Sequence, residues 1–401
     1  MVRNAVGMSD LLAELDSWLH SNWDPDLTVS EWWTRLGTSG WAAPSLPPNA
    51  YGKGVSRNDA IAIGQRIVAH GAVPAPGGLG MLLAAPTIAV HGTQEQIDRY
   101  VLPIVTGQHA WCQLFSEPGA GSDLAGLGTR AVKDGEEWVV TGQKVWTSGG
   151  HIADMGMLIA RTAPDVPKHQ GITWFAFDMH QGAAVDVRPL REMTGRALFN
   201  EVFLSEARVP DAAIIGGTNN GWAVANTTLM FERAGLGAGG HSAAALAAPG
   251  TVAGDLPKRV GDFVRPATPG GAGGAQAAGM PKLLTQLAKA NGMIHDASFR
   301  QDLMRLHTLH EVGRMLTLRV KAEKAAGRDI PAAPNIGKLS MSEIMRKSRD
   351  LGMRVAGVEG TLHGYSSASR TANEAAGVNP AMAFITELAL FRSEEHTSEL
   401  Q

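Results

Sequence analysis

Apolar positions follow a helical period over the first part of the chain. In "SDLLAELDSWLH" the leucines and the tryptophan recur every three to four residues, as on one face of an amphipathic helix. Further on, "HGTQEQIDRYVLPIV" places Thr93 three residues before Gln96, which is a capping-box pattern. These patterns predict helices from Ser9 to about Gly107, and the amphipathic start predicts neither a signal peptide nor a membrane span there.

The pattern changes to short β-type segments from Ala110 to about Val209. The segments "EWVVTGQKVWTSG", "MGMLIART", "GITWFAFDM" and "NEVFLSEARVP" are rich in β-branched and aromatic residues, and Gly, Asp or Pro separates them. This alternation of short strands and turns predicts an antiparallel β domain. One of its strands is expected to carry Trp146 and Ser148.

Helical patterns return from Gly221 onward, as in "PKLLTQLAKANGMI" and "SMSEIMRKSRDLGMRVAG". Between Ala247 and Met280 the Gly and Pro content predicts a mobile loop rather than a helix. The order of helices, strands and helices predicts an α+β fold rather than alternating βαβ units. We expect an N-terminal helical domain over 1–108, a middle β domain over 109–215 and a C-terminal helical domain over 216–391.

Composition narrows the class of protein. A chain of 401 residues is long enough for several packed subdomains that enclose a cofactor. With 35 basic and 38 acidic residues the net charge is -3, which argues against a partner that is a nucleic acid or a membrane surface. The single cysteine, Cys112, excludes a disulfide framework and a thiolate metal cluster, so we expect a cytoplasmic protein without a metal site.

Two stretches carry candidate chemistry. In "WCQLFSEPGAGSDLAG" a Gly-rich turn brings backbone amides and the hydroxyls of Ser116 and Ser122 into one loop, where they can approach an anion or a polar ring. Such a turn alone is a weak signal, but Trp146 and Ser148 follow nearby and offer an indole face and a further hydroxyl. In "NTTLMFERAGLGAGG" the carboxylate of Glu232 lies in an apolar run, where it is either a paired structural ion or a group that does chemistry.

Four segments, taken together in their order and spacing, carry a resemblance to a known family. They are "AVHGTQEQIDRYVLPIVTGQ", "SEPGAGSDLAG" with "GQKVWTSGG", "LREMTGRALFNEVFLSEARVP" and "GWAVANTTLMFER". The chain resembles bacterial members of the acyl-CoA dehydrogenase family from Ser9 to about Phe391. The resemblance implies helical, β and four-helix domains in that order, FAD as cofactor and a tetrameric assembly.

The resemblance also assigns roles to residues. It implies that FAD is contacted by Gln113, Ser116, Gly121, Ser122, Trp146 and Ser148. Ser122 would also face the pantetheine of an acyl-CoA, with Phe231 and Arg233 beside the substrate. Glu232 falls where some members carry the base that removes the α-proton, which favours chemistry over a structural ion.

The implied activity is FAD-dependent α,β-dehydrogenation of an acyl-CoA, with electron-transferring flavoprotein as electron acceptor and fatty acid or sterol catabolism as context. Two alternatives stay open. The first is an FAD-poor structural partner subunit of a heteromeric dehydrogenase. The second is a flavin monooxygenase or oxidase on the same fold. Homomeric and heteromeric assembly are both compatible with the resemblance.

The C-terminal part departs from the family in two places. Residues 392–401, "RSEEHTSELQ", back-translate with one codon choice to AGATCGGAAGAGCACACGTCTGAACTCCAG, a common sequencing-adapter sequence. We therefore expect an artefactual tail that replaces the natural C-terminus, including the segment with a YEG-like motif that helps polarise the thioester carbonyl. The Arg-x-x-Phe-Gly stretch whose Arg reaches FAD across a dimer is not found between Ala247 and Met280.

Overall fold

The computed structural model describes residues 8–193, 195, 197–236, 247–264, 272–328, 330, 332–362, 364, 366–379 and 381–390. They form two compact units: the first holds 8–190, 198–235 and 247–264, and the second holds chiefly 272–390. The expected artefactual tail lies outside the described residues. The compact units do not separate the helical and β domains expected over 1–108 and 109–215, whose limits stay a prediction.

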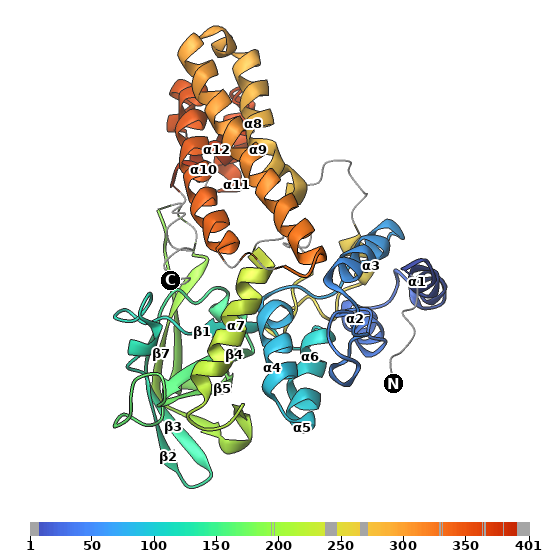
Figure 1. Cartoon of the computed structure of the whole chain (residues 1–401), viewed down its shortest axis with the longest axis vertical. Helices are drawn as coiled ribbons and strands as arrows, with labels where there is room; N and C mark the ends of the chain where they lie inside the picture. The colour runs from blue at the N-terminus through green and yellow to red at the C-terminus, as the bar shows by residue number, and fades with distance from the viewer. Residues whose placement is uncertain are drawn as a thin grey trace. The chain divides into compact units, whose positions relative to one another are not determined.

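The first unit begins with helices, as the periodicity predicts (Figure 1). Helix α1 buries Leu11, Leu15 and Leu19 on one face, and α2 buries Trp32 and Trp33. The helices of this part are α1 (Met8–Asn22), α2 (Val29–Thr38), α3 (Arg57–Ala69), α4 (Ala85–His91), α5 (Gln94–Gln96) and α6 (Leu102–Val105). Two π-helical turns, η2 (Gly80–Ala84) and η3 (Ile97–Val101), precede α4 and α6.

The capping box predicted at Thr93 is confirmed. The Thr93 hydroxyl accepts a hydrogen bond from the Gln96 amide at 3.3 Å, and the Gln96 side chain accepts one from the Thr93 amide at 3.0 Å. Two of the amide groups that a helix start leaves unpaired are thereby satisfied. The helical residues that follow, Gln94 to Val105, lead directly to the first strand of the sheet.

An eight-stranded sheet follows, in the order β6-β7-β3-β2-β4-β5-β8, with β1 paired to β4. The strands are β1 (Trp111–Leu114), β2 (Arg130–Asp134), β3 (Glu137–Lys144), β4 (Met155–Arg161), β5 (Ile172–Asp178), β6 (Val185–Leu190), β7 (Phe199–Pro210) and β8 (Ile214–Ile215). Adjacent strands are antiparallel except for β1 with β4 and the single β2–β4 pair, which are parallel. The expectation of an antiparallel sheet is therefore wrong for the β1–β4 and β2–β4 pairs. Strand β1 can run parallel to β4 because a loop and the β2–β3 hairpin form a crossover between them.

Helix α7 (Gly221–Leu236) packs on the same core as the sheet through Val224, Ala225 and Leu229. Its first residue has no side chain because a Cβ on Gly221 would lie 2.5 Å from the Thr173 carbonyl carbon of β5. A segment over 247–264 with the 3-10 helix η8 (Val260–Phe263) then contacts the start of α2. Val29 and Ser30 there donate to the carbonyls of Lys258 and Leu256, which satisfies two amides at the α2 N-terminus.

From residue 272 on, the described part of the second unit consists of helices joined by turns, with a core that includes Leu284, Phe299, Leu306 and Ile385. Its helices are α8 (Ala272–Ala290), α9 (Ala297–Ala325), α10 (Ala333–Ala356), α11 (Ser367–Ala375) and α12 (Ala381–Leu390). The loop expected up to Met280 is wrong from Ala272 on, since alanines between the glycines favour helix there. Among the described helices none is long and apolar enough to cross a membrane.

Candidate active site

Two segments of the first unit meet beside β1 and β3. The turn after β1, residues 115–129, contacts the residues that follow β3: the Val145 amide donates to the Ser116 carbonyl at 2.9 Å. Both segments carry residues predicted to contact FAD. Trp146 and Ser148, however, do not lie on a strand, which corrects the prediction: β3 ends at Lys144, and a bend and a turn follow.

The backbone at Trp146 explains why the strand ends. Trp146 has a φ of 61°, in the left-handed region that a bulky residue rarely occupies, which costs about 1–3 kcal/mol. Reciprocal 3.0 Å backbone hydrogen bonds between Thr147 and Asn200 hold the residues beyond it. The indole is 42% exposed and meets the Phe199 ring edge to face, with ring centroids 5.8 Å apart. The chain thus presents a large aromatic face at the surface in a strained conformation.

The other predicted FAD contacts are spread over the same region. Gln113 is half-buried on β1, next to Met157 of β4, and Ser116 is buried just after β1. Gly121 is half-buried and has open space where a Cβ would stand, and Ser122 is exposed beside it. Ser148 is exposed in the turn after Trp146. The structure brings Ser116 close to the Trp146 segment and leaves the roles of all these residues a proposal.

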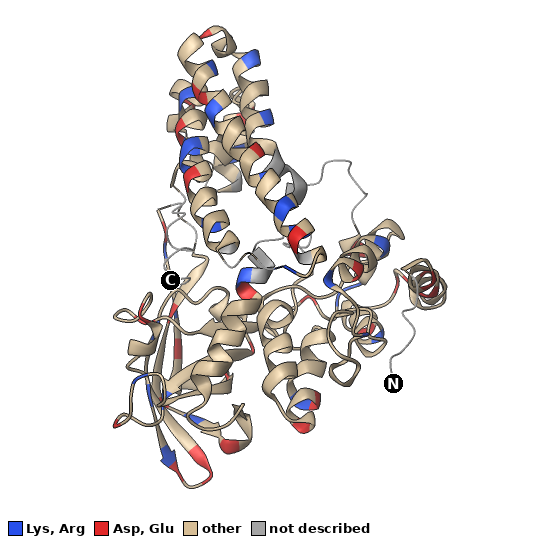
Figure 2. Ribbon diagram, viewed as in Figure 1, with Lys and Arg blue, Asp and Glu red and all other residues tan. Residues whose placement is uncertain are grey.

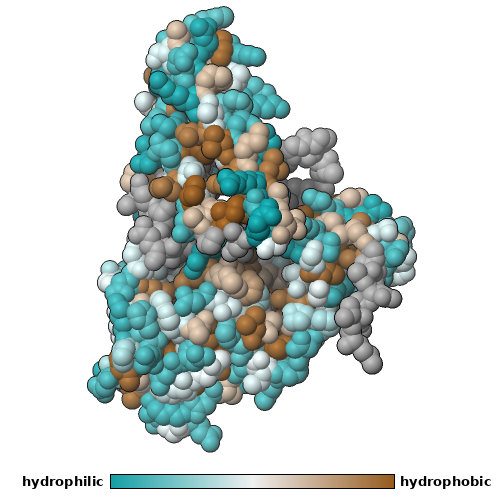
Figure 3. Space-filling model, in the orientation of Figure 1, coloured by the Kyte–Doolittle hydropathy of each residue, from teal (hydrophilic) through white to brown (hydrophobic). Residues whose placement is uncertain are grey.

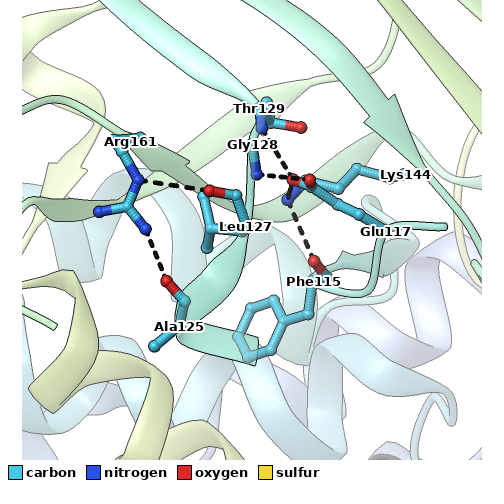
Figure 4. A network of polar contacts seen from close by, with 8 residues as sticks. All are labelled: Phe115, Glu117, Ala125, Leu127, Gly128, Thr129, Lys144 and Arg161. Atoms are coloured by element: carbon cyan, nitrogen blue, oxygen red, sulfur yellow. Dashed lines mark hydrogen bonds and ion pairs between the residues drawn. The ribbon is translucent and has the colours of Figure 1, made fainter. Parts of the chain in front are cut away.

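A buried ion pair lies between the two segments (Figure 4). Lys144 Nζ lies 2.8 Å from Glu117 Oε1 and 3.0 Å from the Phe115 carbonyl oxygen. The Glu117 carboxylate also accepts hydrogen bonds from the amides of Gly128 at 2.6 Å and Thr129 at 3.0 Å. One carboxylate and one ammonium therefore join both ends of the turn to the end of β3.

The environment shifts the pKa of both members of the pair. Burial would raise the pKa of Glu117, but the Lys144 charge and the hydrogen bonds from Lys144, Thr129 and Gly128 outweigh it and lower the pKa. Burial lowers the pKa of Lys144 to about 8, because desolvation exceeds the opposing attraction of Glu117. At neutral pH both groups are charged, and the pair is intact.

A second cation holds the far side of the same turn. Arg161, at the end of β4, donates to the carbonyls of Ala125 at 2.6 Å and Leu127 at 3.3 Å (Figure 4). A third hydrogen bond of 3.0 Å reaches the Lys168 carbonyl on the loop between β4 and β5. The Lys168 ammonium in turn pairs with the Asp123 carboxylate at 2.7 Å. The turn that carries Ser122 is thus fastened on both sides by charged groups.

Glu232 lies in the last part of helix α7, in the same compact unit. Thr228, one turn earlier, is fully buried and its hydroxyl bonds to Thr87 of α4 at 3.1 Å. Because residues four apart share a helix face, Glu232 follows Thr228 on the side that faces the core. Glu232 and Phe231 are half-buried, whereas Arg233 is exposed. The helix therefore carries the predicted base at the edge of the core rather than in open solvent.

These residues fit a bound FAD. An indole exposed in a strained backbone, beside a loop with hydroxyls and backbone amides, offers a face and polar edge groups to a planar ring. Among the described residues, no group of three or more His, Cys, Asp or Glu is arranged to hold a metal ion. Figure 2 shows Lys and Arg interspersed with Asp and Glu over both units.

Sequence reasoning missed the charged residues that support the candidate site. Glu117 and Lys144 lie inside the motifs that predicted it, 27 residues apart, and Arg161 ends a predicted strand. A signal was present, because Lys144 lies at an even spacing from Trp138 and Val140, on the buried face of the alternating strand. This signal did not identify Glu117 as the ion-pair partner of Lys144, because local patterns do not show which distant residues meet in the fold.

Comparison with known proteins gives the class of this chain. The family model described as "Acyl-CoA dehydrogenase, N-terminal domain" matches residues 11–108, and "Acyl-CoA dehydrogenase, middle domain" matches residues 112–206. The chain is 30% identical to acyl-CoA dehydrogenase FadE26 of Mycobacterium tuberculosis over 335 residues, which are 82% of this chain and 75% of that protein. The chain belongs to the acyl-CoA dehydrogenase family, a family of oxidoreductases, as its motifs predicted.

Two further likenesses refine the picture. The chain is 50% identical over 204 residues to acyl-CoA dehydrogenase FadE34 of Mycobacterium tuberculosis, which is 51% of this chain but only 28% of that protein. The fold is similar to that in the crystal structure of the ChsE4-ChsE5 complex from Mycobacterium tuberculosis, with a TM-score of 0.66, 24% identity, and coverage of 100% of this chain and 96% of that one. The second likeness supports the predicted helical, β and helical fold.

Proposed function

We propose that the chain catalyses the FAD-dependent α,β-dehydrogenation of an acyl-CoA thioester to the trans-2-enoyl-CoA. Family membership supports the reaction class. The structural observation that supports it most is the meeting of residues 115–129 with the strained, exposed Trp146 segment in one compact unit. Bound FAD would supply the hydride acceptor, with Gln113, Ser116, Gly121, Ser122, Trp146 and Ser148 as its contacts.

The chain's own residues would bind the thioester and move one proton. Glu232 would take the proton from the acyl α-carbon, since a carboxylate at the edge of the core can be reached by a substrate yet is shielded from bulk water. Ser122 would face the pantetheine, and Phe231 and Arg233 would line the substrate on the same helix. The acyl chain stays open, and electron-transferring flavoprotein is the proposed electron acceptor.

A variant of the base tests this proposal. The purified chain is loaded with FAD, mixed without oxygen with a panel of acyl-CoAs, and the flavin absorbance is followed for the unchanged chain and for Glu232→Gln. We expect bleaching by at least one acyl-CoA that is lost in Glu232→Gln and kept in Glu95→Gln, an exposed control on α5. Equal bleaching in all three chains would remove Glu232 from the mechanism.

Two alternatives are separated by the same preparation. A structural partner subunit would bind little FAD, an alternative favoured by the lack of an Arg-x-x-Phe-Gly stretch between Ala247 and Met280. A flavin that bleaches and then consumes oxygen during turnover would favour an oxidase or monooxygenase. Electron transfer to a flavoprotein acceptor with no oxygen uptake would support the dehydrogenase.

We further propose that the chain assembles with a second copy or with a related subunit. Apolar side chains are exposed on the second unit, among them Val312 (60%), Met315 (56%) and Leu339 (71%). Figure 3 shows brown, apolar areas on the face of this helical unit that is turned to the viewer. Extended apolar surface of this kind is typical of a protein interface. Light scattering of the purified chain, alone and with a candidate partner subunit, separates homomeric from heteromeric assembly.

A further inference from the structure

The ion pair of Glu117 and Lys144 joins the two segments that carry the proposed flavin contacts. The side chain of Lys144 is 0% exposed and that of Glu117 is 10% exposed. Replacing a buried ion pair with apolar groups of similar size is often neutral or stabilising. Stability alone is therefore a weak explanation for the pair, and its geometry gives a stronger one.

The pair closes the turn into a fixed loop. Glu117 lies at the start of the turn, and its carboxylate accepts hydrogen bonds from Gly128 and Thr129 at the end of the turn. Gly121 and Ser122 lie between these two ends. A backbone contact confirms how tightly the end of the turn lies on β3, because a Cβ on Gly142 would come 2.7 Å from the Thr129 Cα. The carboxylate thus fixes the span of the loop that carries two proposed flavin contacts.

Lys144 extends this restraint to the indole. Its ammonium holds Glu117 and the Phe115 carbonyl, and the next residue, Val145, donates to the Ser116 carbonyl. The left-handed Trp146 follows directly. A strained backbone persists only where its surroundings fix it on both sides. The Lys144 contacts fix it on one side, and the Thr147–Asn200 hydrogen bonds fix it on the other.

We propose that Glu117 and Lys144 are positioning residues of the flavin site: their buried ion pair sets the turn 115–129 and the Trp146 segment at the distance and orientation that a flavin requires. This inference rests on the proposed function for the identity of the ligand. The arrangement of the two segments does not rest on it, because the pair is a property of the protein without ligand. The two parts can therefore be tested separately.

The test compares the unchanged chain with the double variant Glu117→Gln/Lys144→Met. Removal of both charges leaves neither ion buried alone, so we expect the double variant to melt close to the unchanged chain. In the protein without FAD, we expect faster amide hydrogen exchange in residues 115–129 and 145–148 but not in β5. We expect the dissociation constant for FAD to rise about tenfold or more, as for the loss of one or two hydrogen bonds.

A matched control removes an exposed pair from the same sheet. Asp134→Asn/Arg208→Gln deletes a 2.6 Å pair whose side chains are 58% and 52% exposed. We expect this control to leave FAD affinity and the exchange of residues 115–129 unchanged. A loss of affinity in the control equal to that in the buried double variant would contradict a specific positioning effect.

The outcomes separate the two proposals. Unchanged exchange and unchanged FAD affinity in a stable double variant would overturn the positioning inference. If the unchanged chain binds no FAD, the proposed function fails, and the exchange experiment still decides whether the pair positions the segments. If the double variant does not fold, Glu117→Asp takes its place. Aspartate keeps the charge but has a shorter side chain, so we expect faster amide hydrogen exchange in residues 115–129 and about threefold weaker FAD binding. If this variant had the same exchange and the same FAD affinity as the unchanged chain, the inference would be overturned.

Discussion

The two compact units differ in how completely they cover their own apolar and polar groups. In the first unit, Trp32, Trp33 and Trp174 are fully buried, and the charges of Glu117 and Lys144 are paired inside. In the second unit, α9 buries Phe299, Leu303 and Leu306 in its first half. None of its described side chains from 307 to 325 is buried.

This difference indicates which buried side chains stabilise each unit. The first unit encloses large aromatic side chains, and one of them, the Trp32 indole, donates a hydrogen bond to the Val73 carbonyl at 2.7 Å. The second unit has a short core. Beyond it, the C-terminal half of α9 and the N-terminal half of α10 expose apolar side chains. All the candidate site residues lie in the first unit, and the proposed assembly surface lies on the second.

The strongest challenge to this comparison is to remove an aromatic residue from the first unit. Trp32→Ala deletes a fully buried indole and its hydrogen bond, so we expect a loss of about 3–5 kcal/mol in the free energy of unfolding. Denaturant unfolding followed by circular dichroism measures it. The exposed Trp146→Ala serves as the control and is expected to change stability far less. A loss below about 1 kcal/mol for Trp32→Ala would contradict the importance of this core.

The corresponding change in the second unit should have a smaller effect. Leu306→Ala removes a fully buried aliphatic side chain from a shorter core, and we expect a loss of about 2–3 kcal/mol. Hydrogen exchange of α9 and α10 localises the effect to this unit. Exchange that rises equally in β4 and β5 would show that the two units unfold as one, contrary to the division.

Acid should weaken the first unit through Glu117. Its pKa lies below the ordinary value of 4.5, so the pair contributes stability that is fully present above that pH and is lost as the pH falls through the folded pKa. Each unit of pKa lowering corresponds to about 1.4 kcal/mol. We expect the difference in unfolding free energy between the unchanged chain and Glu117→Gln to narrow below pH 4.5. The exposed variant Glu95→Gln supplies the baseline, and a difference that stays constant across this range would exclude the pair as an acid-sensitive group.

The smallest stability effect is expected on the apolar face of the second unit. Met315→Glu changes a side chain that is 56% exposed, so we expect a change within about 0.5 kcal/mol. We expect the same change to lower the oligomeric mass found by light scattering, because a charge at a protein interface is desolvated. Arg305→Glu, on an exposed part of the same helix, is the control. An unchanged assembly in Met315→Glu would place the interface elsewhere.

The sequence by itself determined the kinds of elements and their order. The leucine spacing of α1, the capping box at Thr93 and the short strands with aromatic and β-branched residues are local patterns, and local patterns record which face of an element is buried. The family motifs likewise identified the class of protein and the loop and helix that carry the candidate site. These features need only neighbouring residues, and the structure agrees with them.

The tertiary structure alone decided what depends on contacts between distant residues. It paired β1 with β4 in parallel and ended β3 before Trp146. It also brought Glu117 to Lys144, across 27 residues of chain. A carboxylate or an ammonium carries no local mark of its partner, because the free energy of burying a charge depends on which opposite charge and which amides the fold places around it.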